Sequence, residues 1–131
     1  MSEKQKLLIV DDSELNRDIL KEILGSSYDY LEAENGTQAI QILEVHPEID
    51  LMLLDINMPQ MNGFQVLEHM RELQWIDEIP VVMISSEESV EIMRKAYDLG
   101  ITDYISRPFD AVIVKKRVQN TLGLYANQKR L

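Results

Sequence analysis

Short runs of apolar residues recur along the chain. Three of them are unbroken and two are weaker; in chain order they cover residues 7–10, 30–33, 51–54, 81–84 and 103–105. Unbroken apolar runs are typical of parallel strands that are buried on both faces, whereas half-exposed strands alternate polar and apolar residues. We therefore expect a sheet whose centre is formed by 7–10, 51–54 and 81–84.

Each run is followed by a segment with apolar residues at helical spacing. The apolar positions are Leu15, Ile19, Ile23 and Leu24; Ala39, Ile40, Leu43 and Val45; Phe64, Val66, Leu67, Met70 and Leu73; Val90, Ile92, Met93, Ala96, Tyr97 and Leu99; Val112, Ile113, Val118 and Leu122. Gly25 and Gly100 are placed to end the first and fourth helices, and the fifth starts near Asp110. This alternation predicts an α/β fold, a flavodoxin-like doubly wound (βα)5 domain. Its five-stranded parallel sheet has the order 2-1-3-4-5 and helices on both faces.

Polar side chains stand at the ends of four of the predicted strands. They are Asp11 and Asp12 after the first, Asp55 after the third, Ser85 and Ser86 after the fourth, and Arg107 after the fifth. In the order 2-1-3-4-5 these strands are neighbours, so the groups converge on one crevice, while the second strand ends outside it. Three close carboxylates repel one another unless a cation lies among them, and oxygen ligands favour Mg²⁺. The pattern predicts a magnesium site.

Each acid also has a simpler interpretation. Asp11 and Asp12 could serve as the N-cap and first-turn acid of the helix that begins near Ser13. Asp55 could be a turn residue ahead of Asn57. The three acids together favour the metal site over these separate roles.

Composition narrows the class of protein. The 131 residues suit one domain, and the net charge of −10 argues against direct binding of nucleic acid. There is no cysteine and no signal peptide at the N-terminus, and no apolar stretch exceeds four residues. We expect a cytoplasmic protein with no membrane segment.

A carboxylate beside a magnesium ion can act as a nucleophile on phosphorus and form an acyl phosphate. Asp55 is the candidate for this role. Arg107 and the Ser85 hydroxyl are the groups of the chain that could neutralise charge on the transferring phosphoryl oxygens.

Four segments in order resemble the receiver domain of bacterial two-component response regulators, which includes the single-domain chemotaxis regulator. The resemblance runs from residue 7 to about 122, through residues 8–12 (LIVDD), 53–63 (LLDINMPQMNG), 80–85 (PVVMIS) and 103–109 (DYISRPF). Any one segment is a weak signal, but the four together are highly specific.

The resemblance implies a site. Asp55 is the phosphoacceptor, and Mg²⁺, for which Mn²⁺ can substitute, is bound by Asp12, Asp55 and the backbone carbonyl of Asn57. It also implies that Asp11 acts through a metal-bound water and that Ser85 contacts the phosphoryl group after transfer.

The resemblance further implies a switch. Tyr104 matches the aromatic residue that turns inward as the Ser85 hydroxyl moves, although a partly buried aromatic on an edge strand is the simpler interpretation. Asn57 and Glu87 flank the path of the hydrolytic water and tune dephosphorylation, unless both are merely solvated.

One position departs from the family. The residue before Pro108 is usually Lys and is Arg107 here, which keeps the charge but is longer and planar. The corresponding peptide bond of the family is typically cis, so the resemblance implies a cis Arg107–Pro108 bond, the alternative being an ordinary loop proline. His46 and His69 are expected on the surface, so the phosphohistidine donor is another protein.

These expectations define a phosphorelay switch rather than an enzyme. A histidine kinase or phosphotransfer protein phosphorylates Asp55, and the face made by the fourth helix, fifth strand and fifth helix then changes its affinity for a partner. A homodimer through that face is left open. A phosphatase of the haloacid dehalogenase type needs a second Asp where Asn57 stands, and no glycine-rich loop marks a nucleotide site. A receiver-like dimerisation module is the remaining alternative.

The C-terminal end raises the question of output. Residues 1–124 are assigned to the receiver domain, and 125–131 to a helical extension that could begin a linker to an output domain. A freestanding regulator is the alternative.

Overall fold

The computed structural model describes residues 4–58, 61–86 and 89–129, with side chains described as far as residue 125. Five parallel strands form one sheet in the order β2-β1-β3-β4-β5. The strands are β1 (Gln5–Val10), β2 (Tyr28–Ala33), β3 (Leu51–Asp55), β4 (Val81–Ser85) and β5 (Asp103–Ser106). The predicted strands, their order and their direction are confirmed.

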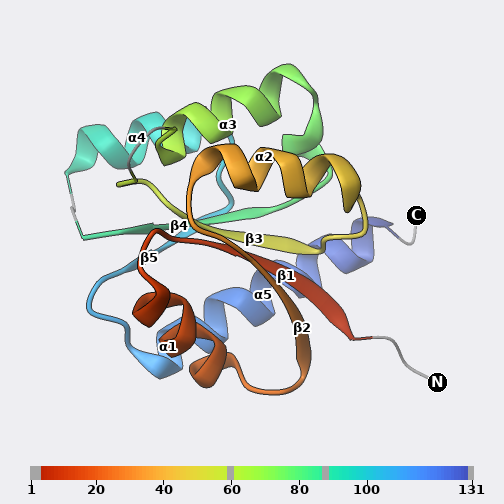
Figure 1. Cartoon of the computed structure of the whole chain (residues 1–131), viewed down its shortest axis with the longest axis vertical. Helices are drawn as coiled ribbons and strands as arrows, with labels where there is room; N and C mark the ends of the chain where they lie inside the picture. Colours follow the sequence, from red (N-terminus) through yellow and green to blue (C-terminus); the bar gives the residue numbers. More distant parts are fainter. Residues whose placement is uncertain (1–3, 59–60, 87–88, 130–131) are drawn as a thin grey trace.

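Helices cover both faces of the sheet. They are α1 (Glu14–Leu24), α2 (Gly36–Val45), α3 (Gly63–Glu72), α4 (Val90–Asp98) and α5 (Ala111–Lys129), with a short 3₁₀ helix, η1 (Trp75–Asp77), that the sequence analysis did not predict. Figure 1 shows α2, α3 and α4 on one side of the sheet and α1 and α5 on the other. The fold is therefore the predicted doubly wound α/β domain.

Each central strand contributes to two hydrophobic cores because successive side chains point to opposite faces. In β3, Met52 and Leu54 pack in the core beneath α2 and α3, whereas Leu51 and Leu53 pack in the core of α1 and α5. All four side chains are fully buried. The unbroken apolar runs of the sequence are thus explained by two layers sharing one strand.

Local signals set the ends of the helices. Ser13 caps α1, its hydroxyl accepting the N–H of Asn16, and Gly25 ends that helix at a φ of +83°. Asp110 caps α5 by accepting the N–H groups of Val112 and Ile113. These ends agree with the predicted positions at Gly25 and Asp110.

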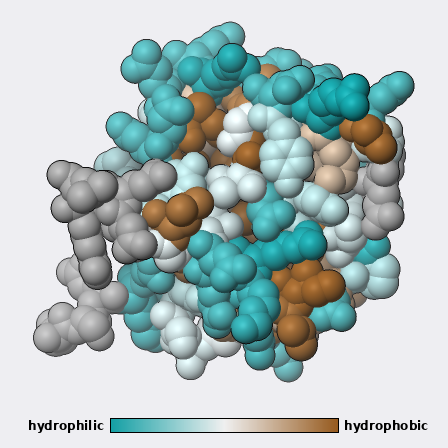
Figure 2. Space-filling view, turned by 180° about the vertical axis from the view of Figure 1, so that it is seen from behind, coloured by the Kyte–Doolittle hydropathy of each residue, from teal (hydrophilic) through white to brown (hydrophobic). Residues whose placement is uncertain are grey.

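The predicted apolar faces of the helices are only partly buried. Leu15, Val45, Val90 and Val112 are 66–72% exposed, and each lies within the first or last two residues of its helix. Periodicity reports the side of a helix that a residue occupies, but it does not report how far the sheet extends beneath it. Figure 2 shows hydrophobic residues on one side of the molecule as separate groups among hydrophilic ones.

Candidate phosphoacceptor and metal site

Asp11 follows the last residue of β1 and its side chain is completely buried. Its Oδ1 accepts the N–H of Ser13 at 2.9 Å, and its own backbone N–H donates to the carbonyl of Ala33 at 3.1 Å. The N-cap of α1 is Ser13 rather than either acid. The capping interpretation of Asp11 and Asp12 is therefore wrong, although Asp11 does order the turn that leads into the helix.

Asp55 is the last residue of β3 and is 1% exposed. Its Oδ1 accepts the N–H of Asn57 at 3.0 Å, as a turn-forming aspartate does, but its buried Oδ2 accepts no hydrogen bond within the described part of the chain. Burial raises the pKa of the carboxyl, and the charge of Asp11 adds to this, while the Asn57 N–H and Arg107 act in the opposite direction. One oxygen thus has a turn role and the other is left for another ligand.

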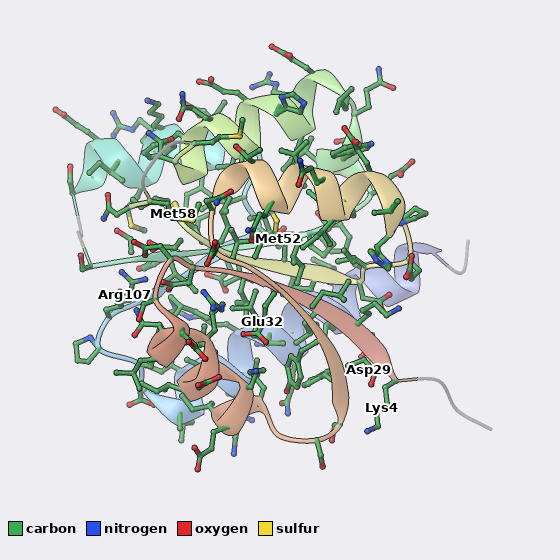
Figure 3. The ribbon with its side chains drawn as sticks, viewed as in Figure 1. Lys4, Asp29, Glu32, Met52, Met58 and Arg107 are labelled. Atoms are coloured by element: carbon green, nitrogen blue, oxygen red, sulfur yellow. The ribbon has the colours of Figure 1, made fainter. Side chains whose placement is uncertain are left out.

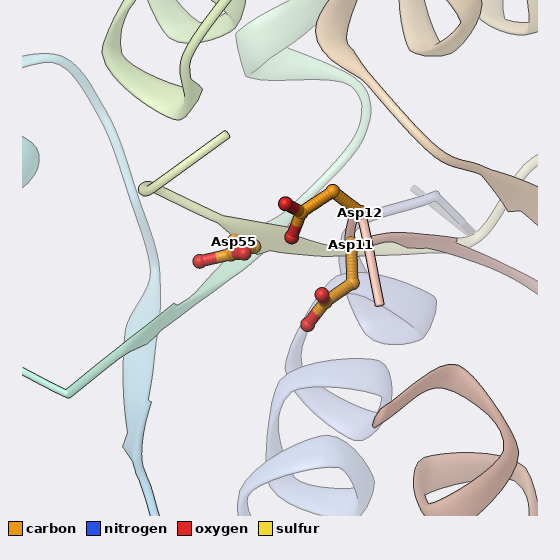
Figure 4. A group of neighbouring side chains, drawn as sticks. All are labelled: Asp11, Asp12 and Asp55. Carbon is orange, nitrogen blue, oxygen red and sulfur yellow. The ribbon is translucent and has the colours of Figure 1, made fainter. Parts of the chain in front are cut away.

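The three predicted acids come together. Asp11, Asp12 and Asp55 each offer a carboxylate oxygen, and these oxygens lie within 4.8 Å of one another. Figure 4 shows the Asp12 and Asp55 side chains beside that of Asp11, at the strand ends. Hard oxygen donors and an unpaired buried carboxylate oxygen suit Mg²⁺, which is commonly held by one or two carboxylates and water. The residues present fit the ion that the sequence predicted.

Arg107 reaches the same place from the end of β5. Its Nη2 lies 2.6 Å from Oδ2 of Asp11 and 3.1 Å from Oδ2 of Asp55, while its buried Nε has no acceptor among the described residues. The Arg107–Pro108 bond is cis, as expected. Figure 3 places Arg107 on the same side of the molecule as Met58. Burial alone would lower the pKa of the guanidinium, but the two carboxylates raise it above its ordinary value.

Ser85 and Tyr104 lie on the neighbouring strands. Ser85, 2% exposed, is the last residue of β4, and its carbonyl accepts the N–H of Arg107 at 3.1 Å. Tyr104 is half-buried on the edge strand β5, with the Arg117 guanidinium 4.9 Å from its ring centre. The Tyr104 carbonyl also accepts a hydrogen bond from Arg117.

The remaining predicted positions are more peripheral. Asn57 is exposed just beyond Asp55, and Glu87 lies outside the described residues. His46 is half-exposed at the end of α2 and pairs with Glu48, and His69 is half-exposed on α3. Neither histidine is among the residues at the strand ends.

Two residues that support the site were missed from the sequence. Arg17 of α1 donates through Nη1 to the carbonyl of Asp11 at 2.6 Å, and its Nε pairs with Glu32 at 3.0 Å. Glu32 lies outside the crevice, as expected, yet it holds the arginine that contacts the backbone of Asp11. An Arg one turn into the first helix was the available signal, but its partner depends on the pairing of β1 with β2.

Comparison with known proteins agrees with this geometry. Residues 7–119 match the response regulator receiver domain family. The chain is 35% identical over 120 residues to the chemotaxis protein CheY1 of Helicobacter pylori, covering 90% of this chain and 97% of that protein. It is 34% identical over 116 residues to a probable cyclic di-GMP phosphodiesterase of Vibrio cholerae, covering 88% of this chain but 26% of that protein. The chemotaxis protein CheY4 of Vibrio cholerae superposes with a TM-score of 0.83 at 27% identity, covering 91% and 99% of the two chains.

The chain belongs to the response regulator receiver domain family and is a CheY-like receiver domain of a two-component system. Receiver domains are signalling switches in phosphorelays rather than enzymes in the usual sense, and they work with histidine kinases or phosphotransfer proteins. The family binds Mg²⁺ at an acidic cluster, and in this chain Asp11, Asp12 and Asp55 form a group of three acids. None of the described helices has the length and apolar character of a membrane span.

Proposed function

We propose that Asp55 is the phosphoacceptor of this receiver domain. One observation carries the proposal: Asp55 is buried at a strand end beside two other acids, and its Oδ2 accepts no hydrogen bond from the described residues. The carboxylate attacks phosphorus, the bond from phosphorus to the donor's imidazole nitrogen breaks, and an acyl phosphate forms as the imidazole leaves. The phosphohistidine donor belongs to a histidine kinase or phosphotransfer protein.

Asp11, Asp12, Asp55 and the backbone carbonyl of Asn57 would hold Mg²⁺, with Asp11 acting through water. The bound ion, or Mn²⁺ in its place, supplies positive charge that stabilises the phosphoryl oxygens during transfer. The fit rests on the 4.8 Å cluster of oxygens and on their hard-donor chemistry.

Arg107 and Ser85 act on the transferred group. Arg107 already lies 3.1 Å from the Asp55 carboxylate, so its guanidinium is placed to neutralise charge that arrives on that oxygen. The Ser85 hydroxyl, at the end of the adjacent strand, donates to the phosphoryl group after transfer. Asn57 and Glu87 tune the access of the water that ends the phosphorylated state.

The response of the domain follows from Ser85. Recruitment of its hydroxyl frees space that Tyr104 fills by turning inward, and the face made by α4, β5 and α5 then changes its affinity for a partner or a second copy. The half-buried position of Tyr104 on an edge strand supports such a movement, because its ring lies at the boundary between the core and the solvent.

The test is phosphorylation in the absence of a kinase. The protein is incubated with Mg²⁺ and acetyl phosphate and examined by intact mass, with Asp55→Asn as the matched control. We expect one added phosphoryl group on the parent protein and none on the variant. An unmodified parent, or an adduct that persists in Asp55→Asn, would contradict the proposal.

We also propose that residues 1–124 form the receiver domain and that the segment 125–131 begins a linker to an output domain. The support is that the Vibrio cholerae relative is almost four times as long as the matched region. A freestanding regulator is the alternative. The length of the encoding gene separates the two.

A further inference from the structure

The Arg107 guanidinium occupies the position of a counter-cation in the acid cluster. A single nitrogen, Nη2, lies 2.6 Å from Asp11 Oδ2 and 3.1 Å from Asp55 Oδ2, so it bridges two buried carboxylates. The contact with Asp11 is a charge-assisted hydrogen bond that is slightly shorter than usual for a guanidinium and a carboxylate. The positive charge thus lies between two of the three groups that fit a divalent ion.

The pairing leaves part of the site unsatisfied. Among the residues that the structure describes, Asp55 Oδ2 pairs with the charge of Arg107 at 3.1 Å without accepting a hydrogen bond, and Arg107 Nε is buried without an acceptor. A buried pair that satisfies both partners would leave neither atom in that condition. Asp55 Oδ2 is therefore the oxygen atom that a divalent cation can bind in place of Arg107.

Charge makes the two cations antagonistic. The three carboxylates carry −3 when ionised, and Arg107 reduces this to −2 before any metal arrives. A divalent ion bound to the acids is repelled by the guanidinium a few ångströms away, and the two cations draw on the same carboxylate oxygens. Because Nη2 alone contacts both acids, the positive charge rather than the planar fork of the guanidinium makes the pairing, and a lysine ammonium would have to reach the same point on a shorter side chain.

We propose that Arg107 is the resident counter-cation of the acid cluster and competes with Mg²⁺ for Asp11 and Asp55, so that it sets the metal affinity of the receiver. The proposal rests on the metal site of the proposed function. It does not require that phosphorylation follows the proposed course.

The experiment measures Mg²⁺ binding to the unphosphorylated protein by titration calorimetry at constant ionic strength. We expect Arg107→Gln to bind Mg²⁺ about tenfold more tightly than the parent, the order expected when a like charge is removed at close range with nearly water-like screening. Arg107→Lys, which keeps the charge on a shorter side chain, is expected between the two.

Arg94→Gln is the matched control. Arg94 is exposed on α4 and lines a groove with Glu68, Glu91 and Lys95, away from the strand-end acids. Arg94→Gln makes the same substitution as Arg107→Gln and changes the net charge by the same amount. The Mg²⁺ affinity of Arg94→Gln should therefore stay within twofold of that of the parent. A tenfold gain in both variants would mean that net charge alone is responsible, which would overturn the proposal.

Thermal unfolding is a second measurement, which tests the proposal even if Arg107→Gln is less stable than the parent. Without metal, Arg107→Gln should unfold at a lower temperature than the parent, because two buried acids lose their cation, and Mg²⁺ should restore more of its stability. Equal or weaker Mg²⁺ binding by both Arg107 variants would overturn the competition. If the Mg²⁺ affinity of the Arg107 variants shifts but acetyl phosphate leaves no adduct on Asp55, the proposed function fails and this inference stands. If the adduct forms but the Mg²⁺ affinity does not shift, the proposed function stands and this inference fails.

Discussion

Gly63, the first residue of α3, packs directly against the backbone of Asp55 and Ile56. A Cβ atom there would stand 2.6 Å from Cα of Ile56 and 2.7 Å from the Asp55 carbonyl oxygen. Both are backbone atoms, so neither can move without shifting the end of β3. Glycine at this position therefore lets the helix start directly against the end of β3 at Asp55.

Gly63→Ala is expected to lower the free energy of unfolding by about 2 kcal/mol, in the range of overpacking substitutions. It should also slow the phosphorylation of Asp55, because the strand end must shift. Chemical denaturation and the acetyl phosphate reaction measure the two effects.

Gly123→Ala is the matched control for this substitution. Gly123 lies in α5, and apart from the backbone of its own helix no atom of the described residues comes within 4 Å of the added Cβ, so alanine should stabilise the helix by about 0.5–1 kcal/mol. Equal effects of the two substitutions would contradict the steric explanation.

At the level of single residues, the sequence predicted the three acids but not the side chains that hold them in place. Asp11, Asp12 and Asp55 could be placed together because strand ends meet at one edge of a parallel sheet. The contact of Arg17 with the Asp11 carbonyl could not, because it depends on a side-chain direction and on a partner in β2. Long polar side chains have many rotamers, and local sequence does not select among them.

Helix α1 is tied to strand β2 by a group of ion pairs. Glu32 of β2 contacts Lys21 at 2.8 Å and Arg17 at 3.0 Å, both on α1. The hydrogen bond from Lys21 lowers the pKa of Glu32, and Arg17 adds to the effect. Since Arg17 also contacts the backbone of Asp11, this link joins an edge strand to the acid cluster.

Glu32→Gln is expected to reduce stability by about 0.5 kcal/mol at pH 7, a modest value because the Glu32 side chain is 34% exposed and screened by solvent. The folded-state pKa of Glu32 lies below its unfolded value, so its contribution is present above the ordinary pKa of glutamate and is lost as the pH falls through the lower folded value. Urea denaturation at pH 7, 5 and 4 measures this loss.

Glu22→Gln provides the comparison, since Glu22 is exposed on α1 and forms none of the ion pairs described. The difference between Glu32→Gln and the parent should shrink toward acid pH and in high salt, whereas Glu22→Gln should track the parent throughout. A difference for Glu32→Gln that is constant with pH would show that packing rather than charge is responsible.

Helices and strands could be predicted from the sequence more completely than individual side-chain contacts. Strands β1, β3 and β4 follow from unbroken apolar runs, and Gly25 and Asp110 mark helix ends by local backbone chemistry. The short helix η1 was missed because three residues are too few to show a period. The exposure of terminal positions such as Val45 depends on the extent of the sheet, which no single helix encodes.

The molecule as a whole places like charges together on a chain that already carries −10. Asp12 is the exposed member of the acid cluster, with no hydrogen bond among those described for its side chain. The charge of Asp12 therefore contributes little to the stability of the fold in the absence of metal. A ligand that binds only the folded state stabilises it by mass action, by about 2.7 kcal/mol at one hundred times its Kd.

Asp12→Asn should separate metal binding from folding. We expect its unfolding temperature without metal to equal that of the parent within about 2 °C, because only an exposed charge is removed. Saturating Mg²⁺ should raise the unfolding temperature of the parent and leave that of the variant nearly unchanged. Thermal unfolding with Mg²⁺, and with NaCl at matched ionic strength, measures both.

A large loss of stability in metal-free Asp12→Asn, or full stabilisation of the variant by Mg²⁺, would contradict the assignment of Asp12 as a metal ligand with no structural role.

The sharing of β3 between two cores also limits how the gene can change. Leu51 and Leu53 belong to one layer and Met52 and Leu54 to the other, and Asp55 continues this alternation at the strand end. Deletion of one codon within the strand would exchange the two layers and carry Ile56 into the place of the aspartate. Codon insertions and deletions are thus tolerable between the strands but not within them, so related genes should differ in length at their loops.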